Sequence, residues 1–310
     1  MRLVICLGAL LLALPLLLAA AEPAAGSRQP ETAGQLQHWS LTMPQLGERR
    51  RTVRIYLPPG YVQSQQHYPV LYMHDGHNLF DVKNSNFNKI WAADKAMRAA
   101  VQSGKVEPHI IIGIWAPGTD RHRQYLPRSL YDMTEGDLRA QMDSLTAGGV
   151  ISDRYLDWIA GPLKAWVDQS FRTRPGRDDT AIVGSSMGGL MSCYAFLERP
   201  EVFGRAGCVS SHWPAVDPSA IDEAQLKALW DGWFAARLGQ PDGRRVWMDH
   251  GTATLDAWYA PYQQVIDARL GKSRWKRGRD WESKVYVGAE HEENAWARCQ
   301  AISCRASAWR

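Results

Sequence analysis

The sequence predicts an α/β protein in which one mostly parallel sheet is covered by helices on both faces. Short apolar runs rich in β-branched residues recur along the chain, for example His-Ile-Ile-Ile-Gly-Ile-Trp at 109–115. Such runs lack polar alternation, which is typical of strands buried on both faces. Segments with apolar residues at helical spacing, such as 155–171, lie between them. Strands that alternate with helices indicate crossover connections and hence parallel pairing.

The first half of the chain is expected to begin with two antiparallel strands that are joined across Gly47 and closed off by the Pro-Pro-Gly at 58–60. The segment from Gly118 to Val150 is mixed and glycine-rich, which fits a cap over the site or an ordinary surface loop. The other expected elements of this half are strands at 39–43, 52–57, 69–73 and 109–115 and a helix at 88–103.

The second half continues the alternation of strands and helices. The helix at 155–171 contains Gly161-Pro162, which predicts a kink because proline cannot donate the helical hydrogen bond. A short apolar strand at 181–183 leads into a helix that stops before Pro200. The later elements are expected as strands at 203–209, 245–249 and 284–288 and helices at 221–238, about 257–270 and from Glu293 onward.

The composition is that of one large globular domain, which we expect to span residues 36–310. Of the 310 residues, 45% are hydrophobic and 22% are charged, and the formal net charge is +4. A local basic run lies at 272–279, but one loop is too small a basic surface for nucleic acid, so no nucleic-acid partner is expected.

The N-terminus indicates export. Residues 1–21 combine Arg2, a long apolar run and three small residues that end at Ala21, as in a secretory signal peptide, so the mature protein is expected to be secreted or periplasmic. No comparable apolar run follows, so no stable membrane insertion is expected after cleavage. Residues 22–35 are rich in Ala, Gly, Pro and polar residues and are expected to form a flexible lead-in.

Four cysteines remain after cleavage of the signal peptide, and an oxidising compartment permits disulfides between them. A local bridge between the last two would require the final helix to end between them, because they would otherwise point apart. Their spacing alone leaves the pairing open. These cysteines are Cys193, Cys208, Cys299 and Cys304.

The segment Gly184-Ser-Ser-Met-Gly188 lies between a predicted strand and a predicted helix. A serine hydroxyl is a weak nucleophile, so it must be exposed to a base, and a sharp strand-to-helix turn exposes Ser186 in this way. Glycines two residues before and two residues after the serine remove side chains that would collide as the chain folds back. The alternative is a glycine-rich turn without catalytic function.

Three residues in loops after predicted strands follow one another in the order serine, acid, histidine. In the hypothesis that we derive from this order, His291 takes the proton of Ser186, and Asp256 holds the imidazole in the required tautomer. Asp249 is the rival to Asp256. Further candidates with a structural or solvated alternative are His212, His250, Glu290, Glu292 and Glu293.

A second loop, His74-Asp-Gly-His-Asn-Leu-Phe-Asp81, follows the strand at 69–73. Main-chain N–H groups of Gly76 or His77, together with that of Met187 after the serine, are expected to bind the oxyanion that forms on the substrate. Two histidines and two aspartates so close together also permit a metal site. We expect neither a metal nor a cofactor, and no Cys-x-x-Cys pair is present.

Five motifs, taken in order, resemble the putative esterase family, which is also called the esterase D family. The resemblance covers nearly all of the chain from about Leu36 and implies the α/β-hydrolase fold, serine-ester chemistry, and Ser186 and His291 as nucleophile and base. The family includes S-formylglutathione hydrolases, feruloyl and acetylxylan esterases, enterochelin esterases and mycolyltransferases. The motifs lie at 70–81, 184–189, 200–204, 251–256 and 288–296.

The function expected from these residues is that of an exported serine carboxylic-ester hydrolase acting on a small-molecule or glycan-linked ester. The alternatives are an acyltransferase that uses the same triad, and a non-catalytic glycan-binding protein on the same fold. Candidate substrate-binding residues are Asp75, Arg121, Tyr125 and Trp213.

Overall fold

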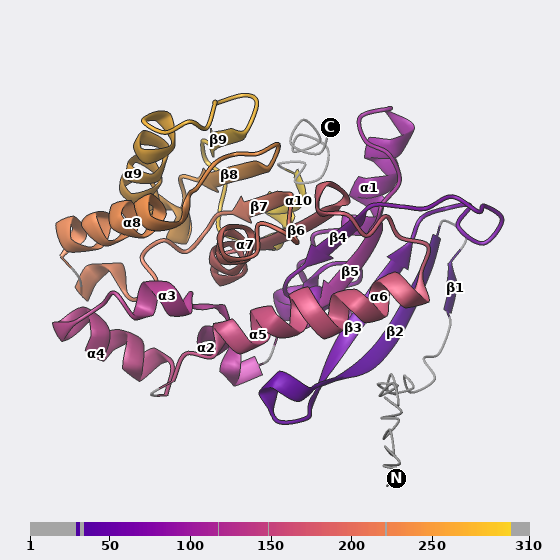
Figure 1. Ribbon diagram of the computed structural model, residues 1–310, viewed down its shortest axis with the longest axis horizontal. Helices are drawn as coiled ribbons and strands as arrows, with labels where there is room; N and C mark the ends of the chain where they lie inside the picture. Colours follow the sequence, from indigo (N-terminus) through magenta and orange to yellow (C-terminus); the bar gives the residue numbers. More distant parts are fainter. Residues whose placement is uncertain (1–28, 32–33, 117, 148, 221, 299–310) are drawn as a thin grey trace, which may run out of the picture.

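The fold was analysed in a computed structural model that describes residues 29–31, 34–116, 118–147, 149–220 and 222–298. Its centre is a nine-stranded sheet with helices on both sides (Figure 1). The strands are β1 (Gln29–Glu31), β2 (Gly34–Met43), β3 (Arg49–Leu57), β4 (Val70–Met73), β5 (Ile110–Ile114), β6 (Thr180–Ser185), β7 (Arg205–Val209), β8 (Arg245–Gly251) and β9 (Trp281–Tyr286). The helices are α1 (Ala93–Gln102), α2 (Arg121–Tyr125), α3 (Arg128–Tyr131), α4 (Gly136–Leu145), α5 (Ser152–Trp158), α6 (Lys164–Ser170), α7 (Met187–Glu198), α8 (Glu223–Arg237), α9 (Ala260–Gly271) and α10 (Glu293–Arg298).

The strands follow the order β1-β2-β3-β5-β4-β6-β7-β8-β9 in the sheet. The pairs β1–β2, β2–β3 and β3–β5 are antiparallel, whereas all pairs from β5 to β9 are parallel. The predicted antiparallel start and the mostly parallel sheet are therefore confirmed. β1 lies within the segment 22–35 for which a flexible lead-in was expected, and it pairs with the start of β2.

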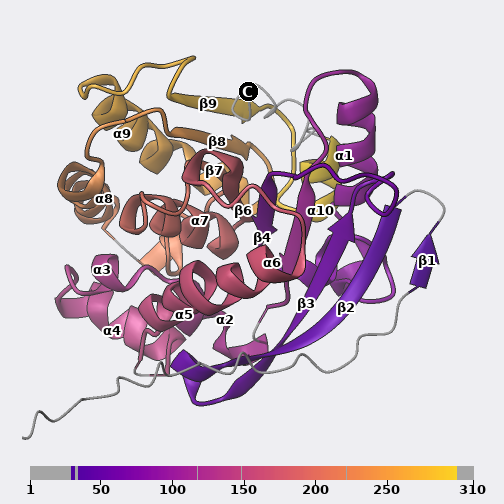
Figure 2. The same ribbon diagram turned by 45° about the vertical axis from the view of Figure 1, so that its right-hand side comes forward.

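Both faces of the central strands are buried, as their uninterrupted apolar runs predict. In β4, Val70 and Tyr72 belong to the larger apolar core, while Leu71 and Met73 belong to a second core on the opposite face. Helices α5 to α9 contribute to the larger core, and α1 and α10 cover the other face (Figure 2). The parallel strands consequently end together at one edge, where their loops can meet.

Helix α1 begins at Ala93, five residues later than its apolar pattern predicts. The backbones of Phe87, Asn88 and Ala92 have positive φ angles of 56°, 56° and 48°. Residues in this left-handed conformation cannot continue a right-handed helix, so the segment before Ala93 forms an irregular loop instead.

The segment 118–150, for which a cap over the site or an ordinary surface loop was expected, contains the three short helices α2, α3 and α4. α2 packs against α5 and α7, and α3 packs against α8. The Gly161-Pro162 pair lies in a π-helical turn, Ile159–Leu163, between α5 and α6. The interruption predicted in the 155–171 helix therefore has a definite form, because a wider turn avoids the bond that Pro162 cannot donate.

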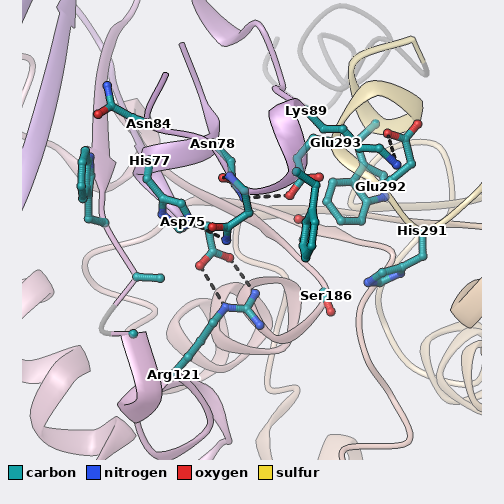
Figure 3. Close-up of a pocket in the computed structure, with 17 residues that line it drawn as sticks. Asp75, His77, Asn78, Asn84, Lys89, Arg121, Ser186, His291, Glu292 and Glu293 are labelled. Carbon is teal, nitrogen blue, oxygen red and sulfur yellow. Dashed lines mark hydrogen bonds and ion pairs between the residues drawn. The ribbon is translucent and has the colours of Figure 1, made fainter. Parts of the chain in front are cut away.

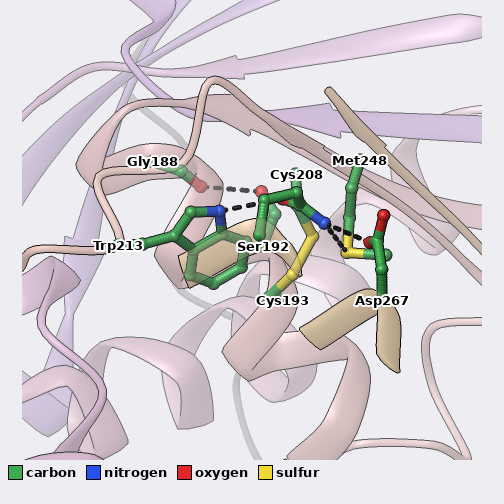
Figure 4. Close-up of a disulfide and its surroundings, with 8 residues drawn as sticks. Gly188, Ser192, Cys193, Cys208, Trp213, Met248 and Asp267 are labelled. Carbon is green, nitrogen blue, oxygen red and sulfur yellow. Dashed lines mark hydrogen bonds between the residues drawn. A yellow bond between two sulfur atoms is a disulfide. The ribbon is translucent and has the colours of Figure 1, made fainter. Parts of the chain in front are cut away.

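A disulfide joins Cys193 in α7 to Cys208 in β7, 15 residues later (Figure 4). Both cysteines are buried, and the bond ties α7, the helix that follows Ser186, to β7, against which it packs. The expected signal peptide (1–21), much of the lead-in, Cys299 and Cys304 lie outside the described residues. Among the residues that the structure describes, no helix is long and apolar enough to span a membrane.

Candidate active site

Ser186 occupies the sharp turn between β6 and α7. Its backbone has φ 58° and ψ −126°, which is a rare conformation for a residue with a Cβ atom. The turn is so tight that a Cβ on Gly184 would lie 2.5 Å from the carbonyl oxygen of Gly188. A Cβ on Gly188 would lie 3.1 Å from the Cβ of His74. Glycine at both positions therefore permits the turn that leaves Ser186 at the edge of a cavity.

His291 and Asp256 come together from the loops after β9 and β8. Nδ1 of His291 lies 2.6 Å from Oδ1 of Asp256. The other oxygen, Oδ2, accepts hydrogen bonds from the Ser210 hydroxyl at 2.7 Å and from the Gly251 N–H at 2.5 Å. Asp256 is 1% exposed, so these donors fix the orientation of a carboxylate that water scarcely reaches. With Nδ1 engaged, Nε2 is the ring nitrogen of His291 available for proton exchange.

The rival residues occupy other surroundings. The carboxylate of Asp249 accepts a hydrogen bond from Trp247 Nε1 at 2.7 Å, inside β8. Nδ1 of His250 lies 2.6 Å from the carbonyl oxygen of Gly251. Neither Asp249 nor His250 is among the residues that line the cavity. The structure thus brings Asp256, and not Asp249, against His291.

A cavity of about 600 Å³ opens beside Ser186 and His291 (Figure 3). Its wall combines residues from the loop after β4, the start of the 118–150 segment and the loop before α10. The lining also contains carboxylates and cationic side chains, and its aromatic and amide side chains suit ligands with both apolar and hydrogen-bonding parts. These are Asn78, Asn84, Asn86, Phe87, Trp115 and Trp296.

Asp75 and Arg121 form a two-pronged ion pair in the cavity wall (Figure 3). Arg121 Nε lies 3.0 Å from Oδ1 of Asp75, and Nη2 lies 2.7 Å from Oδ2. Burial by itself would raise the pKa of the Asp75 carboxyl, but the charge and hydrogen bonds of Arg121 outweigh it, so that pKa lies below its ordinary value. The same carboxylate raises the pKa of Arg121.

The two main-chain segments from which oxyanion donors are expected adjoin residues that line the cavity, Ser186 on one side and His77 on the other. Met187 is the first residue of α7, and the first N–H groups of a helix have no intrahelical acceptor. On the other side, Gly76 begins a short 3-10 turn, and a Cβ there would lie 2.4 Å from the main-chain carbon of Gly113. This close approach presses the turn against β5 and brings the neighbouring His77 to the cavity wall.

Two of the expected substrate-binding residues, Tyr125 and Trp213, are fully buried and do not line the cavity. The ring of Tyr125 lies beneath Arg121, 5.1 Å from its guanidinium carbon. Trp213 donates from Nε1 to Gln263 Oε1 at 2.9 Å. Of that set, the structure places Asp75 and Arg121 at the cavity.

Three neighbours of the site were missed by the sequence reasoning. Ser210 hydrogen-bonds Asp256, and Trp296 donates from Nε1 to the Ser210 hydroxyl at 2.9 Å. The ring of Tyr259 stands edge-on to that of His291, with 5.6 Å between their centres. Ser210 follows β7, so its place after a parallel strand was a usable signal, whereas nothing in the local sequence distinguishes Tyr259 or Trp296 from core aromatics.

The acidic and histidine side chains of the loop 74–81 are engaged with protein partners. Nδ1 of His74 lies 3.2 Å from the Tyr155 hydroxyl, and Asp81 accepts from Arg54 Nη1 at 2.6 Å. Across the part of the chain that the structure describes, no group of three or more His, Cys, Asp or Glu side chains is arranged to hold a metal ion.

The sheet order, the strand-to-helix serine turn and the acid and histidine loops at the same sheet edge define an α/β-hydrolase. Comparison with known proteins supports this fold assignment. The model of the family described as Putative esterase matches residues 45–300. The chain belongs to this esterase family and is an ester hydrolase.

Individual relatives are distant. The chain is 27% identical over 206 residues to the uncharacterized protein YbbA of Bacillus subtilis, covering 66% of this chain and 73% of that protein. It is 25% identical over 195 residues to an endo-1,4-beta-xylanase/feruloyl esterase of Xylanibacter ruminicola, covering 60% of this chain but 23% of that longer protein. The enterochelin esterase of Shigella flexneri is similar in fold, with a TM-score of 0.63 and 17% identity over 91% of this chain and 60% of that one.

Proposed function

We propose that Ser186, Asp256 and His291 are the catalytic triad of this esterase and that hydrolysis passes through a covalent acyl-enzyme. The observation that carries the proposal is the 2.6 Å contact between His291 Nδ1 and Asp256 Oδ1, beside a cavity that is also lined by Ser186. The strained backbone of Ser186 supports the assignment, because such strain is found where a side chain must be presented to a ligand.

In the acylation step, Nε2 of His291 accepts the hydroxyl proton as Ser186 Oγ attacks the carbonyl carbon of the ester. The C–O bond to the alcohol then breaks, and the imidazolium returns the proton to the leaving alkoxide. Asp256 accepts the hydrogen bond of Nδ1–H throughout, which stabilises the imidazolium and holds the ring in place. The product of this step is the Ser186 acyl ester and a free alcohol.

In the deacylation step, water takes the place of the alcohol. His291 removes a proton from the water as its oxygen attacks the acyl carbon, and the same proton then passes to Ser186 Oγ as the acyl bond breaks. In both steps the carbonyl oxygen becomes negative. The N–H groups of Met187 and of Gly76 or His77 are the donors that we assign to this charge, and one such donor lowers the barrier by about 3 to 4 kcal/mol.

An uncharged ester fits the cavity best. Its two cationic side chains are already paired, Arg121 with Asp75 and Lys89 with Glu292 at 3.4 Å. An anionic substrate would have to compete with these partners, and a cationic one would have to draw Glu293 away from Asn78, whose Nδ2 donates to Glu293 Oε1 at 2.7 Å. Aromatic and amide side chains contact a neutral ester without that cost. We therefore infer a neutral small-molecule or glycan-linked ester, which agrees with a relative that is named a feruloyl esterase.

We also propose that the protein is exported, through the signal peptide expected at 1–21. The disulfide between Cys193 and Cys208 supports this, because such bonds persist in oxidising compartments and are rare in the cytosol. Sequencing the N-terminus of the protein recovered from the cell exterior or periplasm tests the proposal. A mature protein that starts near Glu22 is expected, and an intact Met1 on the folded protein would contradict it.

The triad is tested by hydrolysis of p-nitrophenyl acetate. Ser186→Ala should reduce kcat by about 10⁶-fold, with a residual rate that the remaining main-chain donors supply. Asp256→Asn should reduce kcat by about 10⁴-fold, because the amide would favour the wrong imidazole tautomer. The matched control is Asp249→Asn, which removes the rival carboxylate and should leave kcat within a few-fold of wild type. Equal losses in the two Asp variants would refute the assignment of the acid, and an active Ser186→Ala would refute the triad.

A further inference from the structure

One large apolar side chain at the cavity is exposed to water. Phe87, in the short turn Asn86–Asn88, is 88% exposed and lines the same cavity as Ser186. Single exposed apolar side chains are common on protein surfaces. Among the residues that the structure describes, however, Phe87 is the only exposed large apolar residue at this cavity. A substrate bound beside Ser186 can therefore cover a ring that water contacts in the free protein.

The backbone of Phe87 is unfavourable for its side chain. Its φ of 56° and ψ of 22° lie in the left-handed region, which bulky residues rarely adopt and which asparagine tolerates better. The ring gains little packing in return, because it is almost entirely exposed. Strained residues of this kind occur where a side chain is presented to a ligand. Strain and exposure thus both favour a role of the ring in binding.

The turn that carries Phe87 is held by the loop after β4. The main-chain N–H of Asn86 donates to Oδ1 of Asn78 at 2.9 Å, and Nδ2 of Asn86 lies 3.1 Å from Nε2 of His77. Asn78 is itself buried, and its own N–H donates to the carbonyl oxygen of Asp75 at 2.9 Å. The turn is therefore joined to the loop from which an oxyanion donor is expected.

The residues that follow Phe87 are joined as well to the start of α10. Nζ of Lys89 lies 3.4 Å from Oε2 of Glu292 (Figure 3). The main-chain N–H of Ile90 donates to Oδ1 of Asn294 at 3.4 Å. A turn that is held on both sides presents its ring in a fixed place, which reduces the entropy lost when a ligand binds.

An aromatic ring is the ligand group that matches an exposed phenylalanine. Two such rings attract each other in offset or edge-to-face arrangements, and the contact requires no charge. It therefore suits the neutral ester inferred above. A cavity of about 600 Å³ lies within the usual size of ligand sites, so it can hold both the reacting ester group and a ring attached to it.

We propose that Phe87 is a specificity-determining residue, which stacks on an aromatic ring in the acyl or the alcohol part of the ester. This inference rests on the proposed function of Ser186 as the nucleophile. A ring remote from the reacting carbonyl makes the same contact in the bound ester and in the transition state, so losing the contact weakens binding without slowing the chemical step. The effect is therefore on KM and not on kcat.

The test uses two pairs of uncharged esters, and the members of each pair differ in a ring. Benzyl acetate and ethyl acetate differ on the alcohol side, whereas methyl 3-phenylpropanoate and methyl butanoate differ on the acyl side. Comparing each variant with wild type on the same ester removes differences in intrinsic reactivity. The released acid is titrated at constant pH, and thermal unfolding is recorded for every variant.

Phe87→Asn removes the ring and suits the left-handed backbone. It should raise KM about 10-fold for at least one ring-bearing ester, with kcat within about two-fold of wild type and Tm no lower. The ringless ester of that pair should keep its KM within about two-fold. Phe87→Tyr keeps the ring and should retain the wild-type KM. The matched control is Val62→Asn, at an apolar position that is 60% exposed and outside the cavity, and it should leave all four esters unaffected.

The pair of esters that responds identifies the side of the substrate that carries the ring. The inference is refuted if both ring-bearing esters keep their KM in Phe87→Asn, or if the ringless esters are weakened equally. It is also refuted if Phe87→Tyr binds as weakly as Phe87→Asn. The triad stands in each of these cases as long as Ser186→Ala has lost its activity. If Ser186→Ala remains active, the proposed function itself fails, whatever the KM values of the Phe87 variants.

Discussion

Removing the disulfide between α7 and β7 should destabilise the protein by a predictable amount. The perturbation is the double substitution Cys193→Ala/Cys208→Ala. The bond closes a loop with a sequence separation of 15 residues, and a loop of this length contributes about 3 kcal/mol at 25 °C by restricting the unfolded chain. For a chain of this size each kcal/mol corresponds to about 2 to 4 °C in Tm, so a decrease of about 6 to 12 °C is expected.

The assay is thermal unfolding at a fixed scan rate, with and without reductant. Reduced wild type keeps both sulfur atoms, so comparing it with the double variant separates loss of the cross-link from loss of packing. Reduction should lower the Tm of wild type towards that of the double variant and should leave the double variant unchanged. If the oxidised wild type and the double variant unfold within about 2 °C of each other, the bond does not contribute through loop closure, and the reasoning is wrong.

Three further predictions concern the site. Ser210→Ala removes one of the donors to Asp256 and should lower kcat about 10-fold with little change in KM, measured with p-nitrophenyl acetate. Arg121→Gln should lower the free energy of unfolding at pH 7 by about 3 kcal/mol, because it leaves the buried Asp75 carboxylate unpaired. In wild type the low pKa of Asp75 stabilises the fold at every pH above the ordinary pKa of an aspartate, and this contribution is lost only when the pH falls below that value. In the variant burial alone acts and raises the pKa of Asp75, so protonation relieves the buried charge as the pH falls from 7 to 4. The difference in free energy of unfolding between wild type and variant, measured in urea, should therefore narrow over this range, and a difference that widens would contradict this. Gly76→Ala places a Cβ 2.4 Å from a main-chain carbon of β5 and should reduce kcat/KM by about 10²-fold or more by displacing the neighbouring N–H groups, whereas unchanged kinetics would exclude this turn from the site.

Much of the architecture could be predicted from the sequence, because it depends on hydrophobic pattern alone. The buried runs that became β4, β5 and β6 lack polar alternation, and this predicts parallel pairing with helices on both faces. Parallel strands end at one edge of a sheet, so loops that follow them can be expected to converge. That rule brought Ser186, Asp256 and His291 into one hypothesis, and the structure places Asp256 and His291 in contact.

The remainder depends on side-chain direction and loop geometry, which hydrophobic pattern does not determine. Asp249 and Asp256 flank the same strand end, and only the turn after β8 decides that the later residue faces His291. Trp213 follows a strand end as well, but its ring turns into the core. The pairing of Cys193 with Cys208 depends on how α7 packs against β7. Helix propensities likewise do not predict the positive φ angles of the three residues before α1, which delay the start of that helix.

The cavity wall combines segments that lie far apart in the sequence, so it cannot form until the later segment has been synthesised. Asn78, in the loop after β4, donates from Nδ2 to Oε1 of Glu293 at 2.7 Å, at the start of α10. The proposed nucleophile and base are themselves separated by about a third of the chain. A nascent chain that already contains Ser186 thus has neither a base nor a closed binding wall until His291 and Glu293 have been synthesised, and fragments that end before His291 should be inert towards esters.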